Sequence, residues 1–304
     1  MTLAHEPAAP YSAGRFRFAV LTLIGTSLII LLGAQVTTTR AGDSVPGWPA
    51  SFFVPQDRHQ LFELGHRWVA GTAGICIGLL MIWCLRTDRR RSVRRLAVLA
   101  TVLAVVQALI GGLRVKLGLK HHDAVPVVHT LLGQAILAMV TALAVMLSPR
   151  WAAPAAARVD AEAEVLRRRS KALVVAVFIQ AFLGALQRHM IEDRNWAGVA
   201  AHVAGAFVVL WIAAKTVAHV FDRFEADAPL RGPAAALGAA LALQLLLGIF
   251  ALVVTRGDEG YVNAQDATSL IPTLHTLNGA LILAFSTALA LRAGRFVRPP
   301  EGAR

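Results

Sequence analysis

The sequence predicts an all-α membrane protein whose eight transmembrane helices form two tandem four-helix bundles, related by a pseudo-two-fold axis along the membrane normal. Three observations support this fold class: an apolar composition, eight long apolar runs and an internal repeat. The chain of 304 residues is 56% hydrophobic and only 16% charged, with a mean hydropathy of +0.59. Such a chain is too apolar for a soluble globular protein, so we take the lipid bilayer as its solvent.

The eight apolar runs have lengths that suit membrane spans, which need roughly 20 apolar residues each. Polar or charged breaks separate the runs. The third and fifth runs are the shortest, at 18 and 17 residues. The predicted spans cover residues 16–38, 64–85, 96–113, 125–148, 171–187, 198–219, 233–254 and 271–291.

The net charge of +12 invites a nucleic-acid interpretation, because basic proteins often neutralise phosphates. The positive charges instead lie in loops at span ends, such as residues 86–95 with six arginines, and no aromatic-interleaved basic surface accompanies them. Of the lysines and arginines counted by alternate sides, 20 fall on the side of both termini and nine on the other. The positive-inside rule therefore predicts a multi-pass protein of the inner (plasma) membrane with both termini cytoplasmic, and no nucleic-acid partner.

An internal repeat divides the chain into halves. Residues 125–138 (VPVVHTLLGQAILA) match residues 271–284 (IPTLHTLNGALILA) at eight of fourteen positions. Each half has an even number of spans, so both copies enter the membrane in the same direction and the axis lies along the membrane normal. Shorter matches pair Gln107 and Gly111 with Gln244 and Gly248, and Gly33 with Gly184. The predicted parts are a cytoplasmic tail (1–15), an N-terminal bundle (16–150), a cytoplasmic linker (151–170), a C-terminal bundle (171–292) and a second cytoplasmic tail (293–304).

Four of the ten histidines lie inside predicted spans, one in each even-numbered span: His66, His129, His202 and His275. Each falls near the outer start of its span, so the four form a layer at one depth. An ionisable residue within a span is costly and suggests a function. A single histidine would be explained as well by an interhelical hydrogen bond as by a ligand role, and a proton relay would be a further alternative. Two histidines per bundle at one depth favour a shared ligand.

Two imidazoles on facing helices can supply both axial ligands of a haem iron, and bundle cores are a recurring place for such sites. Zinc or copper is the alternative, and either ion would need further Cys, His, Asp or Glu ligands at this depth, where only Glu63 is close. We therefore predict one haem site in each bundle. Small residues beside the ligands would let a flat macrocycle approach, or would serve helix packing alone: Gly65, Gly133, Gly205 and Gly279.

The two halves differ beside the first histidine of each. Glu63 lies three residues before His66 and on the same helix face, whereas Val199 takes this place before His202. A carboxylate there is suited to act as a general base towards a water, or to stabilise positive charge on a substrate. The alternative is a structural ion pair with Arg67. The asymmetry predicts chemistry in the N-terminal half.

Basic side chains in the short outer loops lie just above the histidine layer. Because arginine can bind a carboxylate with two hydrogen bonds, these side chains are candidate partners of haem propionates, and solvated loop charges are the alternative. The candidates are Arg114, Lys116, His121, His122, Arg188 and His189.

At these residues the sequence resembles the haem A synthase family, known in bacteria as CtaA and in mitochondria as Cox15. The resemblance covers nearly the whole chain, from about residue 20 to residue 290, and its specificity comes from the ordered set of motifs. The matching motifs are LGAQVTTTRAG, the WP that follows Gly47, ELGHR (63–67), QALIGGLRV, VVHTLLGQ, LGALQRH, AAHVAG and LHTLNGA.

The resemblance implies an oxidoreductase that oxidises the C8 methyl group of haem O to a formyl group, giving haem A for terminal oxidases. It implies that His202 and His275 ligate the iron of a haem b cofactor in the C-terminal half. His66 and His129 would face the iron of the substrate haem, and Glu63 would be the catalytic carboxylate. Candidate partners are haem O synthase and an electron-transfer protein, and the oligomeric state stays open.

One departure from the family concerns the first outer loop. Many bacterial members carry a cysteine pair there, whereas this chain reads AGDSVPGWPASF without cysteine and has Gly47 where an aspartate is common. Other members also lack the pair, so only a redox relay through this loop is excluded. The alternatives to a synthase are a b-type cytochrome with two bis-histidine haems and a non-catalytic haem-binding assembly factor. Glu63 in only one half argues against the cytochrome, whereas the sequence does not separate an assembly factor from a synthase.

Overall fold

The computed structural model describes residues 11–45, 47–48, 54–117, 124–153, 157–189, 196–224, 228–255 and 266–300. Within these residues, eight helices are long and apolar enough to cross a membrane, which confirms the predicted number of spans. They are α1 (Ala13–Thr38), α2 (Arg58–Thr87), α3 (Arg91–Lys116), α4 (Ala124–Met146), α6 (Ala163–His189), α7 (Trp196–Arg223), α8 (Ala228–Val254) and α9 (Leu270–Phe296). The short elements are α5 (Pro149–Ala152), β1 (Arg158–Val159), the 3-10 turn η2 (Ala267–Ser269) and β2 (Val297–Arg298).

Most of the helices extend beyond the apolar runs, because capping and polar residues build their first turns. At the start of α2, Asp57 accepts a hydrogen bond from the backbone N–H of Gln60 at 2.9 Å, and Ser12 accepts one from Arg15 at the start of α1. Each bond satisfies an N–H that has no partner within the helix. The largest extension is in α6, which begins at Ala163, within the predicted linker. The alanine, glutamate and arginine of that stretch have high helix propensity.

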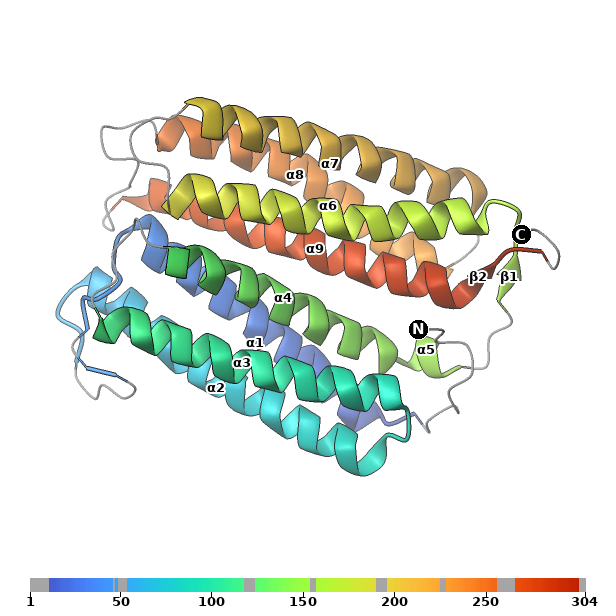
Figure 1. Cartoon of the computed structure of the whole chain (residues 1–304), viewed down its shortest axis with the longest axis horizontal. Coiled ribbons are helices and arrows are strands. Elements are labelled where there is room, and N and C mark those ends of the chain that lie inside the picture. The colour runs from blue at the N-terminus through green and yellow to red at the C-terminus, as the bar shows by residue number, and fades with distance from the viewer. Residues whose placement is uncertain are drawn as a thin grey trace.

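The helices form two groups of four that lie one above the other in Figure 1. Helices α1–α4 make up one group and α6–α9 the other. In each group the first and third helices both pack against the second and the fourth. The groups meet where α4 contacts α6 and α9 and where α1 contacts α9. Both halves thus share one pattern of helix contacts, and the pseudo-two-fold axis between them stays a prediction.

The two ends of the helical body carry different side chains. We call the end at which α2, α4, α7 and α9 begin the histidine end, because the four intramembrane histidines lie there; it is on the left in Figure 1. The opposite end, which holds the arginines of residues 86–95, is the arginine end. Helix α1 begins and α9 ends at the arginine end, as an even number of spans requires.

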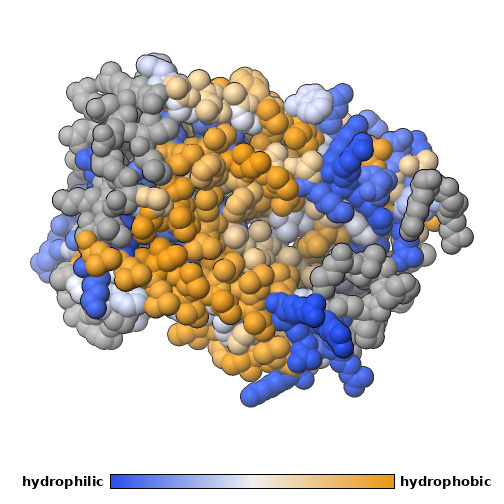
Figure 2. Space-filling view, in the orientation of Figure 1, coloured by the Kyte–Doolittle hydropathy of each residue, from blue (hydrophilic) through white to orange (hydrophobic). Residues whose placement is uncertain are grey.

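The middle of the helical body is apolar on its outside as well as inside. Large apolar side chains are exposed along the helices, among them Ile75, Leu109, Ile179 and Trp211. Figure 2 shows this hydrophobic surface across the middle of the molecule, with hydrophilic surface gathered towards the arginine end. Such a band is suited to contact with the hydrocarbon of a bilayer. The chain is therefore a multi-pass membrane protein.

A buried ion-pair cluster closes the arginine end of the N-terminal group. The side chain of Asp88 is fully buried and lies 2.7 Å from Arg90 and 3.3 Å from Arg15. Arg90 also donates to the carbonyl oxygen of Met146 at the end of α4. Burial alone would raise the pKa of Asp88, but hydrogen bonds from Arg90 and the charges of Arg90 and Arg15 outweigh it and hold the pKa below its usual value.

At the same end, a short parallel strand pair that the sequence did not predict joins the segment before α6 to the segment after α9. Arg158 of β1 lies opposite Val297 of β2, and Arg167 donates to the carbonyl oxygen of Val297. Asp160 follows β1 and pairs with Arg223 of α7 at 3.2 Å. Strands of two residues are too short to show an alternating pattern, so only the folded chain reveals them.

Candidate functional site

All four predicted histidines lie at one end of the molecule. His66 is on α2, His129 on α4, His202 on α7 and His275 on α9, each within the first nine residues of its helix. All four side chains are half-buried. One pair belongs to the first group of helices and the other pair to the second.

Each imidazole ring packs against a glycine on a neighbouring helix. A Cβ atom placed on that glycine would lie 3.0 to 3.2 Å from the Cε1 atom of the ring, tighter than an ordinary contact. Any larger residue would therefore displace the ring. The contacts join Gly33 to His66, Gly111 to His129, Gly184 to His202 and Gly248 to His275.

These four glycines differ from the ones that neighbour the histidines in the sequence. Gly65 has no atom within 4 Å of its Cβ position. The other three face glutamine side chains: Gly133 faces Gln107, Gly205 faces Gln180 and Gly279 faces Gln244. The sequence signal for the ring-contacting glycines is their recurrence in the repeat, where Gly33 aligns with Gly184 and Gly111 with Gly248.

Three glutamines hold the backbone of the helices that carry the histidines. Each donates from its side-chain amide to the carbonyl oxygen of a histidine: Gln107 to His129 at 2.9 Å, Gln180 to His202 at 2.8 Å and Gln244 to His275 at 3.2 Å. The amide of Gln180 also lies 3.1 Å from Nδ1 of His202. Each glutamine precedes a ring-contacting glycine by four residues, a spacing that puts both on one helix face. Ile29 takes the place of Gln180 in the first half.

The two rings of the C-terminal pair have a separation that suits two ligands on one metal. The ring centroids of His202 and His275 are 6.4 Å apart. With metal–nitrogen bonds of about 2 Å, two rings that bind one metal from opposite sides have centroids about 6 Å apart. Within the described part of the chain, Nδ1 of His275 is buried without a hydrogen-bond partner. These residues fit an iron held between two imidazoles.

A zinc or copper site would draw on a larger group of ligands. Among the residues that the structure describes, no three His, Cys, Asp or Glu side chains come together in a group that could hold a metal ion. Zinc usually takes three or four such protein ligands. The two-histidine arrangement is therefore better matched to a haem, whose macrocycle supplies the other four ligands.

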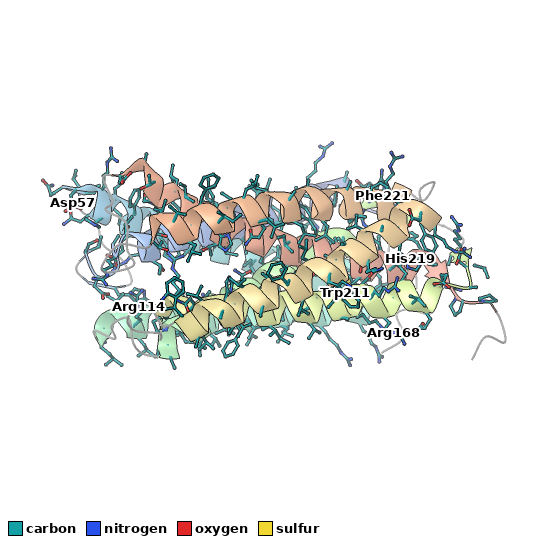
Figure 3. All side chains as sticks on the ribbon, turned by 90° about the horizontal axis from the view of Figure 1, so that it is seen from above. Asp57, Arg114, Arg168, Trp211, His219 and Phe221 are labelled. Carbon is teal, nitrogen blue, oxygen red and sulfur yellow. The ribbon has the colours of Figure 1, made fainter. Side chains whose placement is uncertain are left out.

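The N-terminal pair lies beside a cation. His66 and His129 are close enough for their charges to interact, and Arg114 of α3 lies within electrostatic reach of both. The Nδ1 atoms of both histidines are buried and, among the described residues, make no hydrogen bond. Figure 3 shows Arg114 at the histidine end of the molecule.

Glu63 is almost fully buried, with 4% of its surface exposed, and both of its carboxylate oxygens accept hydrogen bonds. Oε1 accepts from Arg67 at 2.6 Å. Oε2 accepts from the Ser44 hydroxyl at 3.0 Å and from the backbone N–H of Val45 at 2.8 Å. Arg67 in turn donates to the carbonyl oxygens of Val45 and Gly47. The ion pair that the sequence offered as the alternative role of Glu63 is present, and it fastens the loop after α1 to α2.

We call residues 39–48, position 46 excepted, the first loop. Its Trp48 ring packs so closely on Gly112 of α3 that a Cβ atom on this glycine would overlap the indole. Gly47 has a φ of 76°, a left-handed conformation that glycine adopts without strain, which explains the glycine before Trp48. The first loop thus spans from α1 across α2 to α3 at the histidine end.

Arg188 and His189 lie between the two groups of helices. Arg188, near the end of α6, donates to the Thr276 hydroxyl at 3.2 Å and to the carbonyl oxygen of Ala34 at 3.1 Å. His189 is buried, and its Nε2 atom lies 3.4 Å from the hydroxyl of Thr130. Each of the two threonines directly follows one of the four histidines in the sequence. These two basic residues therefore connect the surroundings of both histidine pairs.

The remaining candidate propionate partners are less closely placed. Lys116 is exposed at the end of α3, and His121 and His122 lie outside the described residues. Arg188 lies within electrostatic reach of His275, as Arg114 does of the N-terminal pair. One arginine thus accompanies each histidine pair, although the two come from different helices.

The fold and the site together define a polytopic membrane protein with one histidine pair in each of two four-helix groups. The COX15-CtaA family, described as a cytochrome oxidase assembly protein, matches residues 54–196. A heme A synthase of Geobacillus thermodenitrificans is 27% identical over 320 residues, which cover 94% of this chain and 97% of the relative. A heme A synthase of Geobacillus kaustophilus is 27% identical over 90% of this chain and 92% of its own. One of Bacillus cereus is 30% identical over 56% of each chain. Over these ranges the chain is similar to the COX15-CtaA family and to proteins named heme A synthase.

Proposed function

We propose that this chain is a haem A synthase, an oxidoreductase that oxidises the C8 methyl group of haem O to a formyl group and so provides haem A for a terminal oxidase. One observation carries the proposal. A chain similar to proteins named heme A synthase over more than nine-tenths of its length carries two histidine pairs, and only the first has a carboxylate beside it. The duplicated site suits two haems, and the single carboxylate suits chemistry at one of them.

In the C-terminal half, we propose His202 and His275 as the axial ligands of a haem b. Bound there, haem b supplies one-electron redox chemistry. The ring separation of 6.4 Å supports this assignment. Gln180 and Gln244 hold the two ligand-bearing helices, and the contact of Gln180 with Nδ1 of His202 favours one orientation of that ring.

In the N-terminal half, we propose that His66 and His129 face the iron of the substrate haem O. Arg114, which lies within reach of both histidines, is the candidate partner of a propionate. The first loop covers this end of the first group of helices. A cover of this kind excludes bulk water during the reaction, and it must open to admit a large substrate.

Glu63 is the proposed carboxylate of the reacting site. It lies three residues before His66 on one helix face, where its negative charge would stabilise positive charge that develops on the oxidised substrate. To act as a base towards a water, Oε2 must exchange the hydrogen bond of Ser44 for one from that water, while Arg67 holds Oε1. The first loop would then loosen at Ser44 as the substrate binds.

Turnover requires partners that supply substrate and remove electrons. Conversion of a methyl group to a formyl group with oxygen from water releases electrons and protons, so an electron acceptor is needed. We propose an electron-transfer protein in this role and haem O synthase as the source of substrate. By the positive-inside rule, the arginine end faces the cytoplasm with both termini, and the histidine end lies near the outer face of the inner membrane.

The test is to express the full chain together with a haem O synthase and to determine the extracted haems by mass. Haem A is expected, and a strain with the haem O synthase alone should yield haem O only. If haem O persists unchanged beside a folded, haem-loaded chain, the enzyme proposal is wrong. The result would then favour a b-type cytochrome or a haem-binding assembly factor.

A further inference from the structure

A pocket of about 430 Å³ opens at the arginine end, on the outside of the first group of helices and at the opposite end from the histidines. Nearly all of it is formed by α3, with one residue from α2. Three arginines line one part and apolar side chains the rest. The lining residues are Leu85, Arg91, Arg94, Arg95, Val98, Leu99 and Val102.

The two kinds of side chain follow each other along the helix axis. The arginines belong to the first two turns of α3, and the apolar residues to the next two. At 1.5 Å per residue, the distance along the axis from Arg91 to Val102 is roughly 16 Å. The pocket therefore runs from the charged end of the helix into the apolar band that contacts hydrocarbon.

The three pocket arginines are exposed, and within the described part of the chain none of their guanidinium groups has an ion pair or hydrogen bond. The nearby carboxylate of Asp88 does not neutralise them, because Arg90 and Arg15 already bind it. Arg90 itself is buried in that cluster. The ion-pair cluster thus satisfies one arginine of the 86–95 run and leaves the pocket positively charged.

We infer that this pocket binds an anionic phospholipid, with the phosphate on Arg91, Arg94 and Arg95 and an acyl chain along Val98, Leu99 and Val102. Guanidinium groups bind phosphate through two hydrogen bonds, and basic pockets on the cytoplasmic side of membrane helices suit anionic headgroups. The apolar half distinguishes a lipid from free phosphate, which has no group to place there. The inference does not depend on the proposed enzyme activity, since the pocket lies at the other end of the spans.

The test compares lipid binding by two variants that lose the same charge. The pocket variant is Arg91→Gln/Arg94→Gln/Arg95→Gln. The matched control replaces three exposed arginines at the same end but on other helices, Arg17→Gln/Arg168→Gln/Arg231→Gln; Figure 3 shows Arg168 at the arginine end. Native mass spectrometry of each full chain in detergent measures binding of dioleoyl phosphatidylglycerol, of dioleoyl phosphatidylcholine, and of glycerol 3-phosphate as the headgroup alone.

The unchanged chain should bind phosphatidylglycerol in preference to phosphatidylcholine, and glycerol 3-phosphate should not displace the lipid at equal concentration. The pocket variant should bind phosphatidylglycerol roughly tenfold to a hundredfold more weakly, and the control should bind it nearly as the unchanged chain does. Equal loss in both variants, equal binding of both lipids, or displacement by glycerol 3-phosphate would each overturn the inference.

A second variant, Leu99→Trp, fills the apolar part of the pocket without changing the charge. It should also weaken phosphatidylglycerol binding, because the acyl chain would lose its place. Unchanged lipid affinity in this variant would contradict the inference even if the arginine variant proved unstable.

Discussion

The two halves of the molecule place a pair of histidines on glycines in the same way and differ in what lies over the pair. In each half, a histidine on the second helix and one on the fourth pack against glycines of the first and third. In the N-terminal half, 19 residues connect the first two helices (39–57), whereas six residues do so in the C-terminal half (190–195). Glu63 fastens the longer connection to α2, and its counterpart is Val199.

A second difference lies beside the first histidine of each pair. In the C-terminal half, Gln180 bonds to the carbonyl oxygen of His202 and lies against its ring, whereas Ile29 stands at the equivalent place near His66. The side-chain amide of Gln180 thus gives His202 a contact that the Ile29 side chain cannot give His66, and this contact suits the proposed role of His202 as a ligand of a cofactor that stays bound. Under the proposed function, the repeat would supply a pair of haem ligands in each half, and the additions in the first half, Glu63 and the longer connection, would supply the chemistry.

The largest expected effect comes from replacing Glu63, the carboxylate that only the N-terminal half carries. Glu63→Gln keeps the size of the side chain but removes the charge, so haem A formation should fall roughly 10²–10⁴-fold. The absorption spectrum of haem b should not change, because the C-terminal half is untouched. Val199→Ala, at the equivalent place, should leave turnover nearly unchanged. Loss of the haem b spectrum in Glu63→Gln would show that Glu63 is needed for the structure as a whole.

The next largest effect is a difference in stability between variants of the two acidic residues at the arginine end, Asp88 in the first half and Asp160 in the second. Asp88→Asn leaves Arg15 and Arg90 without a buried counter-charge and should cost about 3 kcal/mol of unfolding free energy. Asp160 pairs with Arg223, whose side chain is half exposed; solvent screens this pair, so Asp160→Asn should cost about 1 kcal/mol or less. Thermal unfolding of both detergent-solubilised variants measures the difference, and equal losses would contradict the contrast.

The pH dependence of the Asp88 effect has a defined sign. The folded pKa of Asp88 lies below its usual value, and the unfolded value is about 3.9. Its stabilisation is therefore fully present above the unfolded pKa and is lost as the pH falls through the folded pKa. The unchanged chain and Asp88→Asn should differ at neutral pH and approach each other in acid. A gap that stays constant down to pH ~2 would contradict this account.

The smallest expected effect concerns the glycine frame that both halves share. Gly184→Ala places a Cβ atom 3.0 Å from Cε1 of His202, so the ring must shift and haem affinity should fall by about tenfold. Gly78→Ala is the matched control on α2, since no atom lies within 4 Å of its Cβ position. Haem retention during purification measures both. Equal retention in the two variants would mean that the glycine contact does not position the ligand.

The spans and the placement of the histidines could be predicted from the sequence, because each depends on local composition or on the repeat. The eight helices follow from hydropathy alone, and the repeat aligns His66 with His202 and His129 with His275. The ion pair of Glu63 with Arg67 could be predicted as an alternative from their spacing of four residues. The contacts of Glu63 with Ser44 and Val45 could not, because these residues reach it only after the first loop folds back over α2. The same holds for β1 and β2, which pair segments about 140 residues apart.

The division of roles between the two halves is tested most directly by haem analysis of one histidine variant in each half. His275→Ala removes a proposed axial ligand and should abolish the low-spin haem b spectrum of the purified chain. His129→Ala should keep that spectrum and abolish haem A formation when haem O synthase is co-expressed. A haem b spectrum that survives in His275→Ala, or that disappears in His129→Ala, would contradict the assignment of cofactor and substrate sites.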